Sequence, residues 1–172
     1  HHSYYETEDY ILFELGFVGG QSMRLVLPKE GKQLNDLLTE PALKAILSSP
    51  EESTQKSAKV NLKLPKFSFD SNFNLNKLCQ SLGLEELFSE SSDLSGISKE
   101  NIAVSNVQQE SHVEIDENGC KAAAYTKIDV REMSLLLDET EEIDLSFDRP
   151  FLFSIQSGDN APLFVGTIYQ PK

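Results

Sequence analysis

The stretch VNLKLPKFSFDSNFNLNKLCQSLGLEELFSESSDLSGIS, residues 60–98, changes its hydrophobic period part-way along. Its first residues alternate between apolar and polar, which predicts a strand whose buried face is made of Val60, Leu62 and Leu64. Residues 74–82 then follow helical spacing, with an apolar face made of Leu75, Leu78, Cys79 and Leu82. Gly83 suits the left-handed position after a helix end. The stretch therefore predicts a strand followed by short helices.

The same mixture extends in both directions from this stretch. Upstream, residues 10–17 and 22–27 flank Gly19-Gly20, which predicts a β-hairpin that ends at Pro28. Residues 34–47 show helical spacing that Pro41 interrupts. Downstream, residues 102–115 form a long extended run, and residues 147–155 and 163–169 predict two more strands around a polar loop. The pattern is α+β, mostly strands with a few short helices.

The amino-acid composition is typical of a globular and strongly acidic protein. The 172 residues are 39% hydrophobic, enough for one domain with a core, and the formal net charge is −13. Such a surface repels phosphate backbones and anionic lipids, so we expect neither a nucleic-acid partner nor a membrane partner. No apolar run is long enough to span a bilayer.

The residue patterns of common enzymes and metal sites are missing. Cys79 and Cys120 lie far apart without a CxxC partner, which gives no zinc pattern and no disulfide framework. His112, the only histidine away from the N-terminus, falls in the extended run and is interpreted as an ordinary strand residue. No serine lies in a GxSxG elbow and no glycine-rich loop precedes a helix. The sequence predicts no enzyme, no cofactor and no metal site.

The segment ENGCKAAAYT, residues 117–126, contains conflicting local signals. Asn118-Gly119 favours a tight turn, while the three alanines that follow favour a helix. No apolar stripe continues past Thr126 to give such a helix a face to bury. Residues 127–146 are the least structured region and carry a cluster of acids, namely Asp138, Glu139, Glu141, Glu142 and Asp144. A loop this long between strands is usually functional or disordered.

Five segments together resemble the serpin family of serine protease inhibitors. LGFVGGQSMRLVLPKEG (15–31) is similar to a hairpin of the family's sheet B, and residues 60–98 match its lPKF…LG…FS…DLSGIS series. ENGCKAAAYT resembles the hinge of the reactive-centre loop. FDRPFLFSI (147–155) and PLFVGTIYQP (162–171) resemble the last two strands of sheet B.

The resemblance implies an α+β serpin fold of which this chain is the β-rich C-terminal part. It would contain strands of sheet B, parts of sheets A and C, and a few short helices. Residues 1–172 would form the C-terminal portion of a single serpin domain, and the N-terminal half of the same serpin would be a partner. The exposed reactive-centre loop would span residues 119–146 approximately.

The resemblance also implies a serine protease inhibitor that acts as a suicide substrate. The target protease cleaves the loop, and the cleaved loop inserts as a strand into sheet A. The hinge would comprise Glu117, Gly119, Cys120, Ala122, Ala123, Ala124 and Thr126. On an inserted strand, alternation puts small residues on the buried face: Cys120, Ala122, Ala124 and Thr126. Lys121, Ala123 and Tyr125 would face the other way.

Counting from the hinge as in the family, the reactive bond falls at Met133-Ser134. A methionine there suits an elastase- or chymotrypsin-like protease, whose pocket selects apolar side chains. The alternative is Arg131-Glu132, which would indicate a trypsin-like target. The family also implies an ion pair between Lys66 and Glu117 at the top of sheet A.

Departures from the family pattern keep a second function open. Asn118, Cys120 and Lys121 differ from the usual hinge residues, so the alternative is a non-inhibitory serpin with a carrier, chaperone or storage role. An enzyme is not expected in either case. By resemblance alone, we expect an extracellular, secreted protein.

Overall fold

The computed structural model describes residues 2–48, 50–116, 119–120 and 141–171. The chain divides into two compact units, His1–Phe67 with Ile115–Lys172, and Ser68–Glu114. No helix within these described ranges has the length and apolar character needed to cross a membrane.

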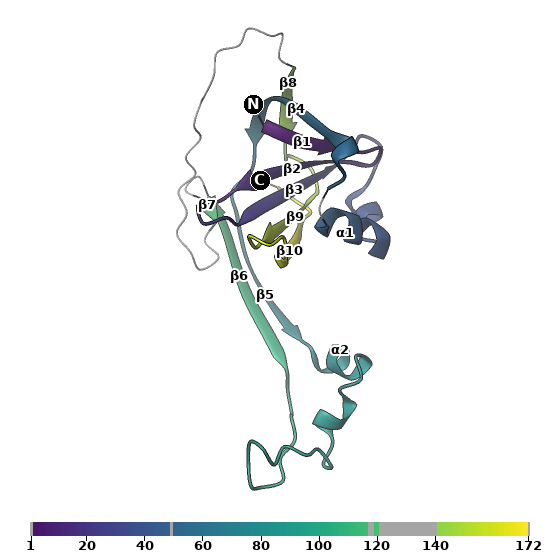
Figure 1. Cartoon of the computed structure of the whole chain (residues 1–172), viewed down its shortest axis with the longest axis vertical. Helices are drawn as coiled ribbons and strands as arrows, with labels where there is room; N and C mark the ends of the chain where they lie inside the picture. The colour runs from purple at the N-terminus through teal and green to yellow at the C-terminus, as the bar shows by residue number, and fades with distance from the viewer. Residues whose placement is uncertain (1, 49, 117–118, 121–140, 172) are drawn as a thin grey trace. The chain divides into compact units, whose positions relative to one another are not determined.

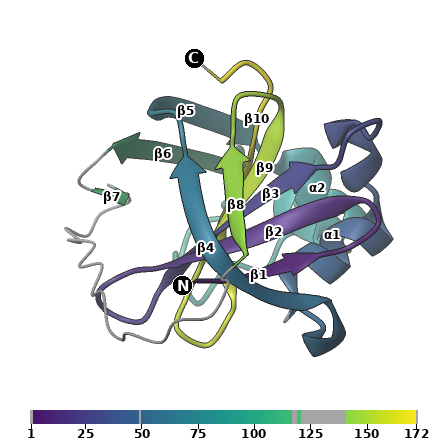
Figure 2. The ribbon, with the colours of Figure 1, turned by 90° about the horizontal axis from the view of Figure 1, so that it is seen from above.

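The first unit is built on a seven-stranded sheet (Figure 1). Its spatial order is β10 (Pro162–Ile168), β9 (Phe151–Gln156), β3 (Ser22–Pro28), β2 (Tyr10–Gly16), β1 (His2–Glu6), β4 (Gln55–Lys63) and β8 (Glu142–Ser146). Neighbouring strands are antiparallel except β4 and β8, which run parallel and lie side by side in Figure 2. Three helical segments accompany the sheet, namely η1 (Leu34–Leu37), α1 (Glu40–Leu47) and η2 (Glu52–Thr54).

One face of this sheet is buried by η1 and α1. Leu12, Val26 and Leu152 stand opposite one another on β2, β3 and β9, so their side chains share a face. They pack with Leu34, Leu37 and Ile46 of the two helical segments in one buried cluster. The helical spacing predicted over residues 34–47 supplies these contacts, and Pro41 lies in the first turn of α1, where its missing N–H costs nothing.

The opposite face of the sheet is also buried, by aromatic side chains. Phe13, Leu25 and Phe153 form the alternate row across β2, β3 and β9. The Phe67 ring lies 5.2 Å from that of Phe153, and Phe147 lies 5.1 Å from Phe151 in an edge-to-face arrangement. Burial on both faces explains why every residue of β3 is buried.

A buried arginine joins α1 to the sheet. Arg24 on β3 is only 1% exposed, yet its guanidinium group is well supplied with hydrogen-bond acceptors. Its Nη1 donates to the main-chain carbonyls of Ile46, Leu47 and Ser48 at 3.2, 3.1 and 2.6 Å. These carbonyls end α1 and have no partner within the helix, so a positive charge there also complements the helix dipole.

The predicted hairpin of residues 10–28 is confirmed as β2 and β3. Its turn closes through a hydrogen bond from Phe17 N to Gln21 O at 2.7 Å. Gly19 and Gly20 have φ values of 111° and 86°, which an L-residue adopts only with strain. The glycine pair in the sequence therefore marks the turn for a backbone reason.

The second unit is a β-ribbon with a short helical excursion. It contains β5 (Phe67–Asn74), α2 (Asn76–Ser81), η3 (Glu85–Phe88) and most of β6 (Gln108–Asp116), and β5 neighbours β6 in a three-stranded sheet. The extended run expected over residues 102–115 becomes a regular strand only from Gln108. The helix predicted over residues 74–82 is confirmed as α2, but its apolar residues Leu78 and Leu82 are 53% and 71% exposed.

Candidate functional site

The candidate site begins on β6, the strand that leads into the expected hinge. Val113 and Ile115 are buried, whereas Glu114 and Asp116 between and after them are half-buried. This alternation is the period of two that a strand imposes when one face is covered. The two apolar residues therefore define the inward face of the strand.

The backbone of two residues of the expected hinge pairs with β6. Strand β7 (Gly119–Cys120) pairs antiparallel with β6, with Asp116 opposite Gly119 and Ile115 opposite Cys120. In an antiparallel pair the two strands run in opposite directions, so β7 runs back along β6. The sequence placed a tight-turn signal at this position, at Asn118-Gly119.

The other end of the expected loop lies in the seven-stranded sheet. Residues 142–146, which the sequence assigns to the loop, form β8 parallel to β4. The Asn61 amide donates to Glu142 Oε1 at 2.8 Å and to Asp144 Oδ1 at 3.0 Å. The hydrogen bond from Asn61 lowers the pKa of the Glu142 carboxyl, and the Lys59–Glu142 pair at 3.3 Å lowers it further. Two residues of the acidic cluster, Glu142 and Asp144, are thus held by polar contacts with β4.

The structure places only a few of the predicted site residues. Within the hinge, the backbone of Gly119 and Cys120 is described. The remaining predicted residues lie outside the described ranges: Glu117, Ala122, Ala123, Ala124, Thr126, Arg131, Glu132, Met133 and Ser134. Lys66, the expected partner of Glu117, is exposed between β4 and β5. The ion pair and the reactive bond therefore remain predictions.

Sequence reasoning missed two features of the first unit. It did not identify Ile115 and Asp116 as the pairing partners of β7, although it recognised the extended run that contains them. It also missed a cavity beside α1, because its lining comes from short segments that no common motif joins. In the described part of the chain, no group of three or more His, Cys, Asp or Glu side chains is placed to hold a metal ion.

Comparison with known proteins gives the family. The family model Serpin (serine protease inhibitor) matches residues 1–171. The human plasma serine protease inhibitor is 37% identical over 158 residues, which cover 90% of this chain and 36% of the relative. The chain therefore belongs to the serpin family, a family of protease inhibitors rather than enzymes. It spans about two fifths of the length of the curated relatives it matches.

Solved structures support the same fold. Serpin48 of the insect Tenebrio molitor, described as a highly specific serpin, superposes with a TM-score of 0.72 at 29% identity. That match covers 96% of this chain and 42% of Serpin48. Thyroxine-binding globulin in complex with thyroxine gives a TM-score of 0.70 at 25% identity, covering 99% of this chain and 44% of the globulin. The predicted α+β serpin fold is confirmed, and the fold includes inhibitory and ligand-binding members.

Proposed function

We propose that this chain is the C-terminal portion of a serine protease inhibitor that acts by suicide-substrate loop insertion. The observation that carries the proposal is the pairing of Gly119–Cys120 with β6. The backbone at the start of the hinge already runs antiparallel to the strand beside which an inserted loop would lie. The function needs no catalytic group of its own, because the nucleophile belongs to the protease.

Extending the observed register gives the pairing that insertion of the proposed hinge would require. Continuing from Ile115 opposite Cys120, Ala122 would face Val113, Ala124 would face Ser111 and Thr126 would face Gln109. Directly opposed residues of an antiparallel pair share a face. Cys120, Ala122, Ala124 and Thr126 would therefore join the face on which Val113 and Ile115 are buried.

The chemistry of these residues fits burial. All are small and uncharged, so they fit between packed neighbours and lose little side-chain entropy when ordered. A charge on this face would be buried without a partner, at a cost of several kcal/mol. Lys121 and Tyr125 take alternate positions, where insertion would leave them on the opposite face.

The loop itself would present the bond that the protease attacks. We place this bond at Met133-Ser134, so that the protease serine forms an ester with the Met133 carbonyl and releases the amine of Ser134. An elastase- or chymotrypsin-like protease would accept methionine in its apolar pocket. Cleavage at Arg131-Glu132 would instead indicate a trypsin-like target. The proposed protein acts outside the cell and is completed by the N-terminal half of the same serpin domain.

A non-inhibitory role as a carrier, chaperone or storage protein is the second candidate. It is favoured by the hinge departures at Asn118, Cys120 and Lys121, and by the structural likeness to thyroxine-binding globulin in complex with thyroxine. An inhibitor and a carrier differ in what cleavage of the loop does.

The deciding experiment mixes the intact protein with elastase, chymotrypsin and trypsin in turn. An inhibitor forms a covalent complex that survives SDS, and mass spectrometry of the released peptide locates the reactive bond. We expect the bond at Met133-Ser134 and a complex with elastase or chymotrypsin. Clean cleavage without a complex, and without a gain in thermal stability, would favour the non-inhibitory role.

Two arginine variants test the insertion face directly. Ala124→Arg puts a charge on the proposed buried face, and we expect it to turn the inhibitor into a substrate that is cleaved without a stable complex. Ala123→Arg is the matched control, because its side chain would lie on the opposite face. Equal loss of complex in both variants would contradict the proposed register.

A thiol reagent gives a readout that needs no variant. Cleavage should bury Cys120 and slow its alkylation by at least tenfold, since the inserted face excludes solvent. Cys79 on α2, a half-buried free cysteine, serves as the internal control and should react at the same rate before and after cleavage. Unchanged reactivity of Cys120 after cleavage would argue against insertion.

A further inference from the structure

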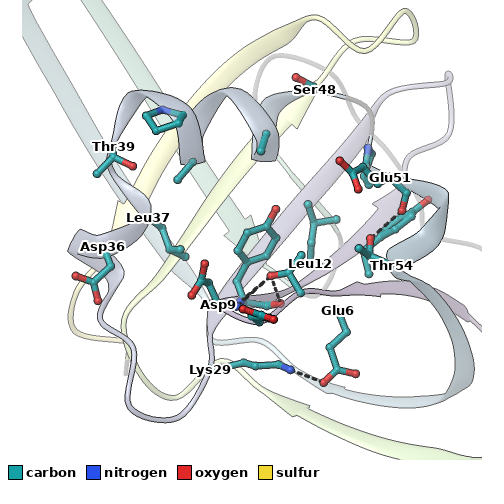
Figure 3. Close-up of a pocket in the computed structure, with 18 of the residues that line it drawn as sticks. Glu6, Asp9, Leu12, Lys29, Asp36, Leu37, Thr39, Ser48, Glu51 and Thr54 are labelled. Atoms are coloured by element: carbon teal, nitrogen blue, oxygen red, sulfur yellow. Dashed lines mark hydrogen bonds and ion pairs between the residues drawn. The ribbon is translucent and has the colours of Figure 1, made fainter.

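A cavity of about 1060 Å³ lies in the first unit, between α1, η2 and the turn that joins β1 to β2 (Figure 3). We call it the α1 pocket. Cavities that hold small organic ligands usually measure roughly 300–1,000 Å³, and they combine apolar walls with a few polar groups. The α1 pocket has the size of such a site and, as its lining shows, the composition of one.

The apolar wall comes from the sheet and from one face of α1. Leu12 and Leu37 are buried side chains of the sheet–helix core that reach the pocket surface. Ala42 and Ala45 line it from α1 and lie three residues apart, on the same face of the helix. Because alanine ends at Cβ, this face leaves open the space that longer side chains would fill.

Acidic side chains dominate the polar part of the lining. Five line the pocket, namely Glu6, Glu8, Asp9, Asp36 and Glu51, against two basic residues, Lys29 and Lys56. Both lysines form ion pairs with Glu6, with distances from Nζ to the carboxylate oxygens of 2.6 and 2.5 Å. Asp9 pairs with Lys32 at 2.6 Å. Among the described residues, no ion pair neutralises Asp36 or Glu51, whose side chains lie on opposite sides of Leu12 and Leu37 in the view of Figure 3.

The pKa of the Tyr10 hydroxyl is shifted by burial and by two of these acidic side chains. Burial raises the pKa of this hydroxyl, and the charges of Asp9 and Glu51 raise it further. Asp9 lies in the β1–β2 turn and Glu51 lies just before η2, so two separate segments act on one group inside the pocket. The interior of the pocket is therefore a region of negative potential beside an apolar wall.

We propose that the α1 pocket binds a small organic cation with an aromatic or apolar body, of the arylalkylamine class. The ring would cover the wall formed by Leu12, Leu37 and the two alanines, and the ammonium group would lie toward Glu51, whose charge no ion pair among the described residues neutralises. An anion of the same shape meets the same wall but is repelled by the carboxylates. A bare metal ion gains nothing from the wall. The site is independent of whether the reactive-centre loop inhibits a protease.

Tryptamine and indole-3-acetate form a matched pair of probes, since they share a ring and carry opposite charges. Isothermal titration calorimetry measures the binding of either probe and needs no optical signal from the protein. With the intact protein, we expect saturable binding of one tryptamine per chain, weakened as salt screens the carboxylates. Indole-3-acetate should bind at least tenfold more weakly. Equal affinity for both probes, or no saturation by tryptamine, would overturn the proposal.

Two variants locate the binding at this pocket. Glu51→Gln should weaken tryptamine binding roughly five- to tenfold, as expected for loss of one charge partner. Glu52→Gln removes the same charge from the neighbouring residue, which does not line the pocket, and should leave the affinity unchanged. Ala45→Leu fills the wall and should abolish binding while the circular dichroism spectrum stays the same. Equal effects of the two glutamine variants, or full binding by Ala45→Leu, would place the ligand elsewhere.

Discussion

The seven-stranded sheet and the β5–β6 unit bury their apolar side chains to very different extents. In the sheet, β3 is buried along its whole length because α1 and η1 cover one face and aromatic rings cover the other. In the second unit, α2 has no buried residue, although its sequence has a helical apolar stripe. Both regions therefore have an amphipathic sequence pattern. Within the described residues, however, only the apolar faces of the sheet are covered by other parts of the chain.

The difference supports the proposal that a longer protein completes the second unit. Helices in proteins are stabilised mainly by packing of their apolar face, and a helix as short as α2 is marginal by itself. The exposed apolar side chains of this unit include Phe73, Leu78, Leu82, Leu84 and Ile97. The proposed N-terminal half of the serpin domain is the surface that would cover them.

Truncation of a leucine in each region is the largest expected contrast. Leu152→Ala in the sheet should lower the free energy of unfolding by about 2–5 kcal/mol, because it leaves a cavity among fully packed neighbours. Leu78→Ala on α2 should change it by less than about 0.5 kcal/mol in the 172-residue chain, as at other exposed positions. Urea denaturation followed by circular dichroism measures both.

The same two variants in the longer protein sharpen the contrast. If the N-terminal half covers α2, the cost of Leu78→Ala should rise to about 2 kcal/mol or more there. A cost that stays near zero would show that α2 remains exposed and would remove this support for the proposed partner.

Arg24 provides the next largest effect, since it holds α1 to the sheet. Arg24→Met keeps much of the side-chain volume but leaves the carbonyls of Ile46, Leu47 and Ser48 without their donor, and should cost about 2–3 kcal/mol. Arg24→Lys retains the charge without the planar fork and should cost less. Thermal unfolding ranks the two variants. A neutral Arg24→Met would mean that apolar packing alone positions α1.

Two glycines with nearly the same φ angle separate local backbone strain from regional packing. Gly20 in the β2–β3 turn has φ of 86° and Gly83 after α2 has φ of 88°, and a Cβ added at either residue would meet no atom within 4 Å. Substitution of either by alanine should therefore cost about 1 kcal/mol from the left-handed backbone alone. Hydrogen exchange of amides next to each site measures the local effect. Markedly different costs would show that the surroundings, rather than φ, set the strain.

Acid titration should show the smallest effect. Hydrogen bonds from Lys29 and then Lys56 lower the pKa of the Glu6 carboxyl below its usual 4.5. A lowered folded-state pKa adds stability that is fully present above the ordinary pKa of 4.5, and this contribution is lost as the pH falls through the folded-state pKa. Because the Glu6 cluster is partly exposed, this contribution to the free energy of unfolding amounts to about 1 kcal/mol or less.

Glu6→Gln tests that titration by removing the group. The unfolding free energy of this variant should depend less on pH below the ordinary pKa of 4.5 than that of the parent protein. Glu30→Gln at an exposed position makes the same change in net charge and serves as the control. An identical acid dependence in both variants would show that the Glu6 cluster adds no stability.

Several elements were predictable because their signals are local. The β2–β3 hairpin follows from two β-rich runs around Gly19-Gly20, and the interruption between η1 and α1 follows from Pro41. Each of these features depends on the conformational preference of one or two residues, so a short window contains the necessary information.

Other features depend on residues that are distant in sequence. Nothing in residues 142–146 indicates that they pair in parallel with residues 59–63, and the acidic composition there favoured a loop instead. The α1 pocket is likewise assembled from the β1–β2 turn, η1, α1 and η2. Such features depend on contacts between segments that are distant in sequence. The hydrophobic period of one segment does not indicate which other segment it will contact.

The sequence alone was enough to predict the β2–β3 hairpin, the helical segments within residues 34–47 and 74–82, the small residues of the expected hinge and, through its motif series, the serpin family. Period, turn chemistry and side-chain size are properties of neighbouring residues, which is why they can be read along the chain. The tertiary structure was needed to show that Arg24 donates to the last carbonyls of α1, that β8 pairs with β4, and that β7 pairs with β6 at Ile115. These depend on which surfaces meet when the chain buries its apolar faces, and that is a property of the whole fold.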